Sequence, residues 1–267
     1  MFYGRKRKTS KKGAKRPYRR AAKRTGKSSA KYIANICKKV ISRKAENKIW
    51  FDYATNVVIP TANLSVPVYR NLCPIVAQAV GKSNRTGNEI TVKNGMIRGH
   101  INILPYNAIT NPFPVPVYVK MWIVSAKGIN TNLLSATTIA SDFLDVINAS
   151  IGLQGNMLDI DLTLNRDSWT LHAQRVVKIG AGFTNTTTNL PVSGGGYFDN
   201  SPMSVPFYFN FGKHLKTLKY DDSNPPYACI NRNLFIVFQS VNADGSTPAG
   251  YTPAEFHYST RVEYEDM

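Results

Sequence analysis

Acidic residues are absent from the first 45 positions of this 267-residue chain, and the first of them is Glu46. Residues 1–50 contain 19 Lys and Arg, whereas residues 51–267 contain 15 basic and 15 acidic residues. The whole net charge of +18 therefore lies in the first fifth of the chain. An excess of one sign at one end predicts a polyanionic partner that is bound by a tail.

Cysteine is scarce, since the chain has only Cys37, Cys73 and Cys229. They lie far apart and form no CxxC pair, so neither a zinc site nor a disulfide framework is indicated, and free thiols are expected. The sequence has no run of 18 apolar residues and no apolar stretch directly behind its N-terminal charges. We therefore expect no membrane insertion and no secretory signal.

Catalytic motifs are also missing, because the sequence contains no HExxH, GxSxG or GxxxxGK[ST] pattern. The histidines occur singly in strand-like surroundings, at His100, His172, His214 and His257. We expect no enzymatic activity, no cofactor and no metal site. Two aspartate pairs could meet a hard cation such as calcium, but ordinary loop positions explain them more simply: Asp159 with Asp161, and Asp221 with Asp222.

What the N-terminus does contain is a dense cationic segment with too few apolar residues to form a core, so it is expected to be disordered without a partner. Its candidate nucleic-acid-binding residues are Arg5, Lys6, Arg7, Lys8, Lys11, Lys12, Lys15, Arg16, Arg19, Arg20, Lys23, Arg24, Lys27 and Lys31. Such side chains neutralise phosphates without reading the base sequence. Tyr3, Tyr18 and Tyr32 interleave the charges and either stack on bases or are incidental.

A short helix is predicted at the end of this segment, over residues 28–44. Ser28 or Ser29 can cap it, and one apolar stripe is formed by Ile33, Cys37, Val40 and Ile41. Residues 1–48 are thus interpreted as a basic nucleic-acid-binding arm with a short helix. The clusters GRKRK and KRPYRR in the arm can also serve as a nuclear localisation signal for an import receptor.

From residue 49 onward the pattern is typical of strands separated by Gly, Pro, Asn and Asp. Candidate strands are residues 50–59, 89–103, 115–125, 169–179, 207–220, 233–241 and 256–265. In VKMWIV, residues 119–124, both faces are largely apolar, so both are expected to be covered. Residues 135–150 are the one further helix candidate. The sequence predicts an all-β fold, a single jelly-roll β-sandwich over residues 49–267.

One local stretch carries a resemblance: SNRTGNEITVKNGMIRGHI, residues 83–101. A polar loop ends in Arg85-x-Gly87 and feeds a strand with alternating Ile90 and Val92 and later Ile97 and Ile101. We expect a turn in which Gly87 takes a positive φ. Arg85 either ties this turn to a neighbouring strand or subunit or is solvated. VYVKMWIV, WTLHAQRVVKIG, NRNLFIVFQS and RVEYED follow in order.

This arrangement resembles the capsid proteins of small circular single-stranded DNA viruses, the circovirus-like, Rep-encoding (CRESS-DNA) group. The arm is Lys-rich as well as Arg-rich, unlike the near-pure Arg arms of circoviruses proper, so the subgroup stays open. The resemblance implies a T=1 icosahedral capsid of about 60 copies with arms facing packaged single-stranded DNA. It also implies a virion that passes through the host nucleus with a host import receptor; the host-cell surface receptor is not indicated.

Three alternatives remain open. A viral single-strand-binding nuclear shuttle or movement protein would stay soluble and form no closed shell. The coat protein of an RNA satellite virus would share the fold and the arm, because phosphate contacts do not distinguish DNA from RNA. A ribosomal or chromatin protein is disfavoured, because such proteins usually carry basic patches on the folded part too.

Overall fold

Two units make up the chain, Met1–Lys44 and Ala45–Met267. The computed structural model describes residues 30–37, 40, 46–60, 68–79, 84–105, 107, 109, 111, 115–128, 142–146, 149–180, 201–221, 228–245 and 251–266. Cys37 is exposed, Cys73 and Cys229 are buried, and all three are free thiols, as expected. Within these ranges, no helix combines the length and hydropathy that crossing a membrane requires.

In the first unit, residues 30–37 and residue 40 are helical. The predicted helix over 28–44 is confirmed at these positions, and its other residues lie outside the described ranges. The apolar side chains of this segment are exposed within the unit, namely Tyr32, Ile33, Ile36 and Val40. The helix therefore has an apolar stripe that the described residues of its unit leave uncovered.

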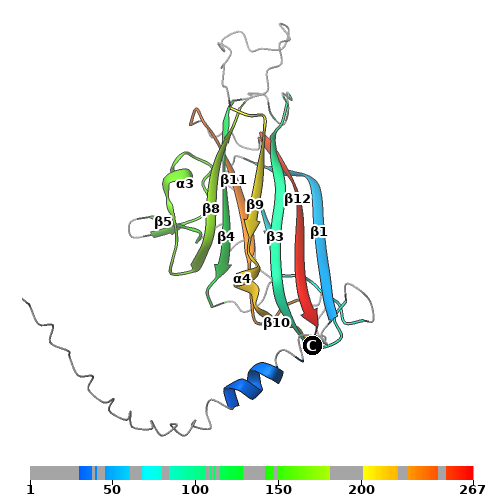
Figure 1. The fold of residues 1–267 in the computed structure, drawn as a ribbon. Coiled ribbons are helices and arrows are strands. Elements are labelled where there is room, and N and C mark those ends of the chain that lie inside the picture. The colour runs from blue at the N-terminus through cyan, green and yellow to red at the C-terminus, as the bar shows by residue number, and fades with distance from the viewer. Residues whose placement is uncertain are drawn as a thin grey trace, which may run out of the picture. The chain divides into compact units, whose positions relative to one another are not determined.

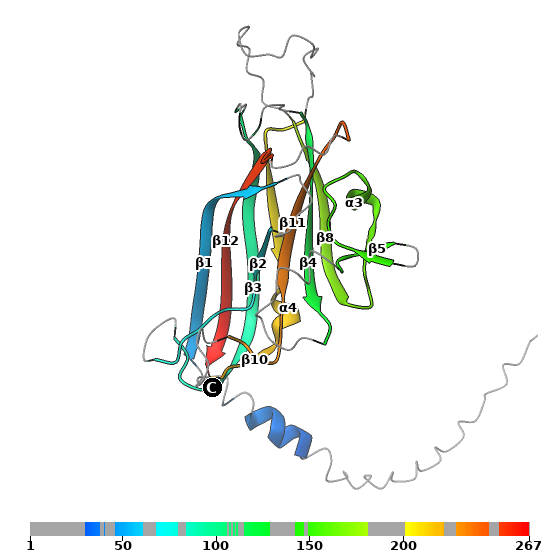
Figure 2. The ribbon, with the colours of Figure 1, turned by 180° about the vertical axis from the view of Figure 1, so that it is seen from behind.

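The second unit contains two large antiparallel sheets (Figures 1 and 2). The first sheet has the order β1 (Glu46–Ile59), β12 (Ala254–Asp266), β3 (Glu89–Ile103) and β10 (Thr217–Lys219), and β9 (Ser204–Asn210) also pairs with β3. The second sheet has the order β2 (Val68–Asn71), β11 (Phe235–Asn242), β4 (Val117–Ala126) and β8 (Trp169–Ile179). Every strand pair in both sheets is antiparallel.

The strand order is that of a jelly roll. Of the eight described strands with four or more residues, the first, eighth, third and sixth along the chain form the first sheet. The second, seventh, fourth and fifth form the second sheet. Apart from the fourth and fifth strands, which pair with each other, successive strands thus alternate between layers, which is the double Greek key of a jelly-roll sandwich. The predicted all-β fold is confirmed.

The main core lies between the two sheets. Alternate residues of β4, such as Met121 and Ile123, pack there with Phe238 of β11 and Phe256 of β12. The Phe238 and Phe256 rings stack with their centroids 4.0 Å apart. Period-two alternation in each strand places these side chains on one face, where removal of their apolar surface from water stabilises the sandwich.

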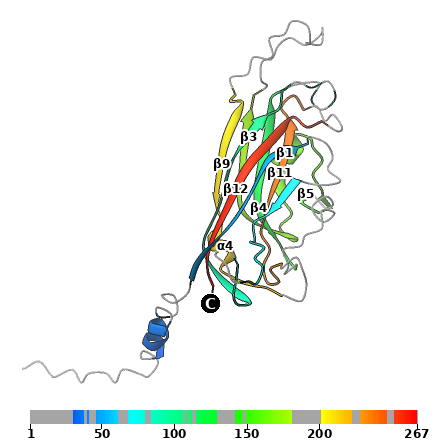
Figure 3. The same cartoon turned by 90° about the vertical axis from the view of Figure 1, so that its right-hand side faces the viewer.

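A second core covers the opposite face of β4. Trp122 packs edge-on against Phe143, with centroids 5.3 Å apart, and Phe143 packs against Trp169 at the same distance. A third sheet supplies this cover, with the order β6 (Ala149–Ile151), β5 (Leu144–Val146) and β7 (Thr163–Leu164). The prediction that both faces of VKMWIV are covered is confirmed. In Figure 3, β5 lies on the side of the sandwich away from β9.

The predicted helix over 135–150 is wrong where the structure describes it, because β5 and β6 pair there as antiparallel strands. Residues 135–141, 147 and 148 lie outside the described ranges. Phe143 and Leu144 are fully buried in the second core. This tertiary burial outweighs the weak local helix pattern.

The single strand predicted over 207–220 is also wrong. β9 ends at Asn210, the one-turn helix α4 (Gly212–Leu215) follows, and β10 begins at Thr217. Both strands pair with β3, β9 along Met96–Asn102 and β10 along Glu89–Thr91. The helix α4 displaces the chain along β3 between these two pairings. Gly212 permits α4 to approach β3 closely, since a Cβ on Gly212 would lie 2.4 Å from the Gly95 nitrogen.

Candidate functional site

The basic arm predicted to bind nucleic acid falls mostly outside the described residues. This applies to 13 of its 14 candidate side chains, from Arg5 to Lys27. Lys31 is described, and it lies exposed on the helical residues 30–37. What the structure describes in detail is the place in the second unit where the chain enters from the arm, at the first residues of β1.

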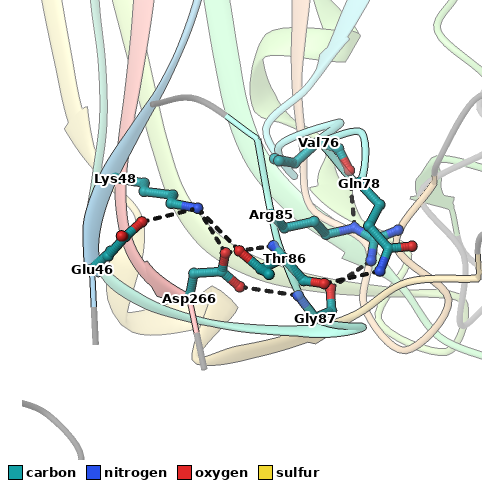
Figure 4. A network of polar contacts seen from close by, with 8 residues as sticks. All are labelled: Glu46, Lys48, Val76, Gln78, Arg85, Thr86, Gly87 and Asp266. Carbon is teal, nitrogen blue, oxygen red and sulfur yellow. Dashed lines mark hydrogen bonds and ion pairs between the residues drawn. The ribbon is translucent and has the colours of Figure 1, made fainter. Parts of the chain in front are cut away.

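A buried ion pair fixes this entry point (Figure 4). β1 begins opposite the end of β12, with Glu46 paired in register with Asp266. Lys48 Nζ lies 2.8 Å from Asp266 Oδ2, and the two side chains are only 5% and 3% exposed. Lys48 Nζ also lies 3.4 Å from the exposed carboxylate of Glu46. The first and last strands of the unit are thus joined by charge as well as by backbone hydrogen bonds.

The loop before β3 completes the network. Thr86 N donates to Asp266 Oδ2 at 2.5 Å, and Gly87 N donates to Asp266 Oδ1 at 3.4 Å. Burial by itself raises the pKa of the Asp266 carboxyl, but the hydrogen bonds from Lys48 and Thr86 outweigh it, so the pKa lies below its ordinary value. Burial likewise opposes the Lys48 charge, yet Asp266 keeps the Lys48 pKa above its usual value. Both groups are therefore charged at neutral pH.

Arg85 holds the same loop from inside the protein. Its side chain is fully buried, and its Nε donates to the Val76 carbonyl at 3.0 Å. Its Nη1 donates to the Gly87 carbonyl at 2.6 Å. The guanidinium also lies over the Tyr220 ring, 4.7 Å from its centroid. Of the two alternatives left open by the sequence, Arg85 ties the turn to its neighbours and is not solvated.

The expectation of a positive φ at Gly87 is wrong. Among the described residues, the glycines with positive φ are Gly128, Gly155 and Gly245. Gly87 instead contributes its backbone, because its N–H donates to Asp266 and its carbonyl accepts from Arg85. The Arg-x-Gly motif is therefore a hydrogen-bonded clamp on the loop and does not mark a left-handed turn.

Two of the histidines that looked isolated in sequence are neighbours in space. The rings of His172 on β8 and His214 on α4 have centroids 4.2 Å apart, and Ser125 Oγ lies 2.8 Å from His172 Nε2. Burial lowers the pKa of His172 to about 4, and the charges of His214 and Lys213 add to this. Among the described residues, no carboxylate hydrogen-bonds either ring, so the group lacks the acid that orients a catalytic imidazole.

Asp159, one of the aspartates considered for a cation, has other partners. Asp159 is buried and accepts hydrogen bonds from Gln154 N at 2.7 Å, from Gly155 N at 2.6 Å and from the Gln239 side chain. Lys120 Nζ donates to the carbonyls of Asp159, Ile160 and Leu162, at the end of α3 (Leu158–Asp161). Asp222 lies outside the described residues. Within the described part, no cluster of three or more His, Cys, Asp or Glu could hold a metal.

No protein-family model and no curated protein matches the chain. Solved viral structures do match. One is from Desmodium yellow mottle tymovirus, at 9% identity and TM-score 0.33, and covers 100% of this chain and 94% of that chain. Another is VP1 of Trichodysplasia spinulosa-associated polyomavirus in complex with sialylated glycooligomers, at 11% identity and TM-score 0.25, covering 82% of this chain and 93% of that chain. Both TM-scores are below 0.5, so neither likeness assigns a function to this chain.

Proposed function

We propose that this chain is a viral capsid protein whose jelly-roll unit tiles into a small icosahedral shell and whose N-terminal arm packages single-stranded nucleic acid. One observation carries the proposal: the charge boundary coincides with the structural boundary. The unit Met1–Lys44 holds 18 Lys and Arg and no acidic residue, whereas Ala45–Met267 holds 16 basic and 16 acidic residues. A neutral wall can pack against copies of itself, and a cationic arm can neutralise phosphates.

The buried contacts at the start of β1 support the same assignment of nucleic-acid binding to the arm and of the shell wall to the folded unit. A segment that pulls on a polyanion transmits force to the first strand of the folded unit. The Lys48–Asp266 pair and the Thr86 hydrogen bond join that strand to β12 and to the loop before β3. The resemblance to capsid proteins of circular single-stranded DNA viruses favours DNA as cargo, about 60 copies in the shell, and nuclear entry through GRKRK and KRPYRR.

Expression of the protein alone tests this proposal. We expect electron microscopy and sedimentation to show megadalton particles of uniform size that hold nuclease-protected nucleic acid. A variant without residues 1–44 should keep the folded unit and lose the protected nucleic acid. A soluble monomer or small oligomer that binds single strands would contradict the capsid proposal and favour the shuttle or movement protein. Extraction of RNA from authentic particles would favour the satellite-virus coat protein.

A further inference from the structure

The outward face of the first sheet carries exposed aromatic rings. Phe51 and Tyr53 on β1 are 55% and 69% exposed, and Tyr208 on β9 is 54% exposed. The strand register places Tyr53, Ser259, Arg98 and Tyr208 in one row across four neighbouring strands. The rings of Phe51 and Tyr53 have centroids 6.0 Å apart. Grouped exposed rings on one face mark a site of interaction more often than scattered ones do.

The same face carries Arg98, which no described carboxylate neutralises, together with Arg261 and His257, which lie 2.9 Å from Glu263 and 3.1 Å from Glu255. Two hollows of about 530 and 520 Å³ open on it, and both are lined by Arg98 and Ser259. Their linings also include Arg261, His100 and His257, but no Asp or Glu. Within the described part of the chain, Arg98 makes no hydrogen bond or ion pair. Arg98 is exposed and stands in the row between Ser259 and Tyr208, with its guanidinium donors available to an anion.

We propose that this surface, which we call the Arg98 face (Phe51, Tyr53, Met96, Arg98, Tyr208 and Arg261), is a second interface for single-stranded nucleic acid. The inference rests on the proposed function. Bases stack on the Tyr53 and Tyr208 rings, and Arg98 binds a phosphate or stacks on a base between them. Stacking of this kind tolerates any base, because every base has a π-face. The arm holds the phosphates, and the Arg98 face holds the bases.

Chain connectivity supports the binding of one nucleic-acid strand by both the arm and the Arg98 face. Phe51 is the seventh residue after Lys44, the last residue of the basic unit, and seven residues span at most about 25 Å. A nucleic acid bound near the end of the arm is thus within reach of the exposed rings. A second copy of this chain is the alternative occupant of this face, and the experiment below separates the two.

Binding of a labelled short oligothymidylate to the full-length protein, over a series of salt concentrations, tests the inference. Tyr53→Ala and Tyr208→Ala should each weaken binding by roughly 5- to 150-fold, with the slope of log K against log salt unchanged. Arg98→Gln should reduce the size of that slope by about 0.7. Leu158→Ala and Arg166→Gln, two exposed positions outside the Arg98 face, are the matched controls and should bind as the wild type does.

An abasic oligonucleotide of the same length separates the two proposals, since it offers phosphates without bases. The wild type should bind it more weakly than oligothymidylate, and Tyr53→Ala should bind both nearly equally. If the wild type binds the two equally and the tyrosine variants bind as the wild type does, the Arg98 face is overturned and the arm stands. Variants that bind normally but no longer assemble would assign the face to contacts between copies. Absence of binding by the wild type would overturn the packaging function itself.

Discussion

The two units of this chain differ most in how their charges are arranged. Met1–Lys44 contains 18 Lys and Arg and no acidic residue, and its described helical residues leave their apolar stripe exposed. In Ala45–Met267, the numbers of positive and negative residues are equal, and acidic groups make specific contacts. Asp266, for example, forms an ion pair with Lys48 and accepts a hydrogen bond from Thr86 N. Unpaired charges of one sign repel each other and prevent a core, whereas balanced charges permit one.

The units also differ in how they respond to pH. The first unit has no histidine and no carboxylate side chain, so its charge stays constant between pH 4 and pH 7. All four histidines and all 16 acidic residues belong to the second unit. Mild acid should therefore change the stability of the folded unit while the arm remains a polycation throughout.

Removal of residues 1–44 should have the largest effect, because it takes away all the excess charge. If the 14 candidate side chains of the arm all engage, the slope of log K against log salt for single strands is roughly −10. The truncated protein should lose nearly all of this slope, while the free energy of unfolding of the second unit changes by less than about 0.5 kcal/mol. A salt titration and a denaturant titration provide the two measurements.

A graded variant serves as the control for that deletion. Replacement of Lys15, Arg16, Arg19 and Arg20 by Gln should reduce the size of the slope by about 3. A steep slope that survives the deletion would locate the phosphate contacts on the second unit and remove the contrast between the units.

Arg85→Ala should be the most damaging single change to the folded unit. It leaves the Val76 and Gly87 carbonyls without their buried donor and opens a cavity beneath Tyr220. We expect a loss of about 4 kcal/mol in the free energy of unfolding, measured by denaturant titration. Gly87→Ala is the comparison, and since its φ is ordinary it should cost less than about 1 kcal/mol. Equal stability of Arg85→Ala and the wild type would contradict the clamp.

Lys48→Met should cost about 3 kcal/mol, because it leaves the buried Asp266 carboxylate without its cation. Glu46→Gln removes the exposed partner of the same ammonium and should change stability by less than about 1 kcal/mol. The Asp266 pKa is lowered in the folded state, so its contribution is present above the unfolded pKa and is lost as pH falls through the folded pKa. The free energies of unfolding of Lys48→Met and wild type should therefore converge in acid. A difference that stays constant as the pH falls would contradict this prediction.

His172→Gln should have the smallest effect, and only in mild acid. Because burial lowers the His172 pKa to about 4, the unfolded chain binds more protons than the folded one between pH 6.5 and pH 4. The free energy of unfolding of the wild type should therefore decrease as the pH falls from 6.5 to 4. In His172→Gln, the dependence of this free energy on pH should be weaker by the contribution of up to one proton. Ser125→Ala, which keeps the imidazole, is the control. Parallel pH profiles for wild type and His172→Gln would show that the histidine pair does not sense pH.

Much of the fold was predictable, because strands are set by local alternation. The predicted 89–103 and 169–179 match β3 and β8 residue for residue, and 50–59 lies within β1. The strands that were missed are short, such as β2 and β7, and have too few residues to show a period. The helix α4 was not foreseen within the strand predicted over 207–220. A one-turn helix has no sequence period of its own, and α4 depends on the packing of Gly212 against β3.

The candidate site was less predictable than the fold. The 14 basic residues of the arm were found from composition, and their role remains a prediction. Arg85 was recognised as a motif residue, but its burial was not foreseen, since nothing local indicates that Val76 and Tyr220 surround it. The ion pair of Lys48 with Asp266 joins residues 218 positions apart, and sequence reasoning missed it altogether.

The sequence by itself determined where the charge lies, where most of the long strands run and that a neutral unit follows a cationic one. These properties depend on the composition and periodicity of neighbouring residues. Only the tertiary structure decided which polar groups meet. Lys48 with Asp266, His172 with His214, and the row from Tyr53 through Arg98 to Tyr208 all depend on strand order and register. The physical reason is that such contacts form between distant segments, and a one-residue change of register would turn each side chain to the other face of its sheet.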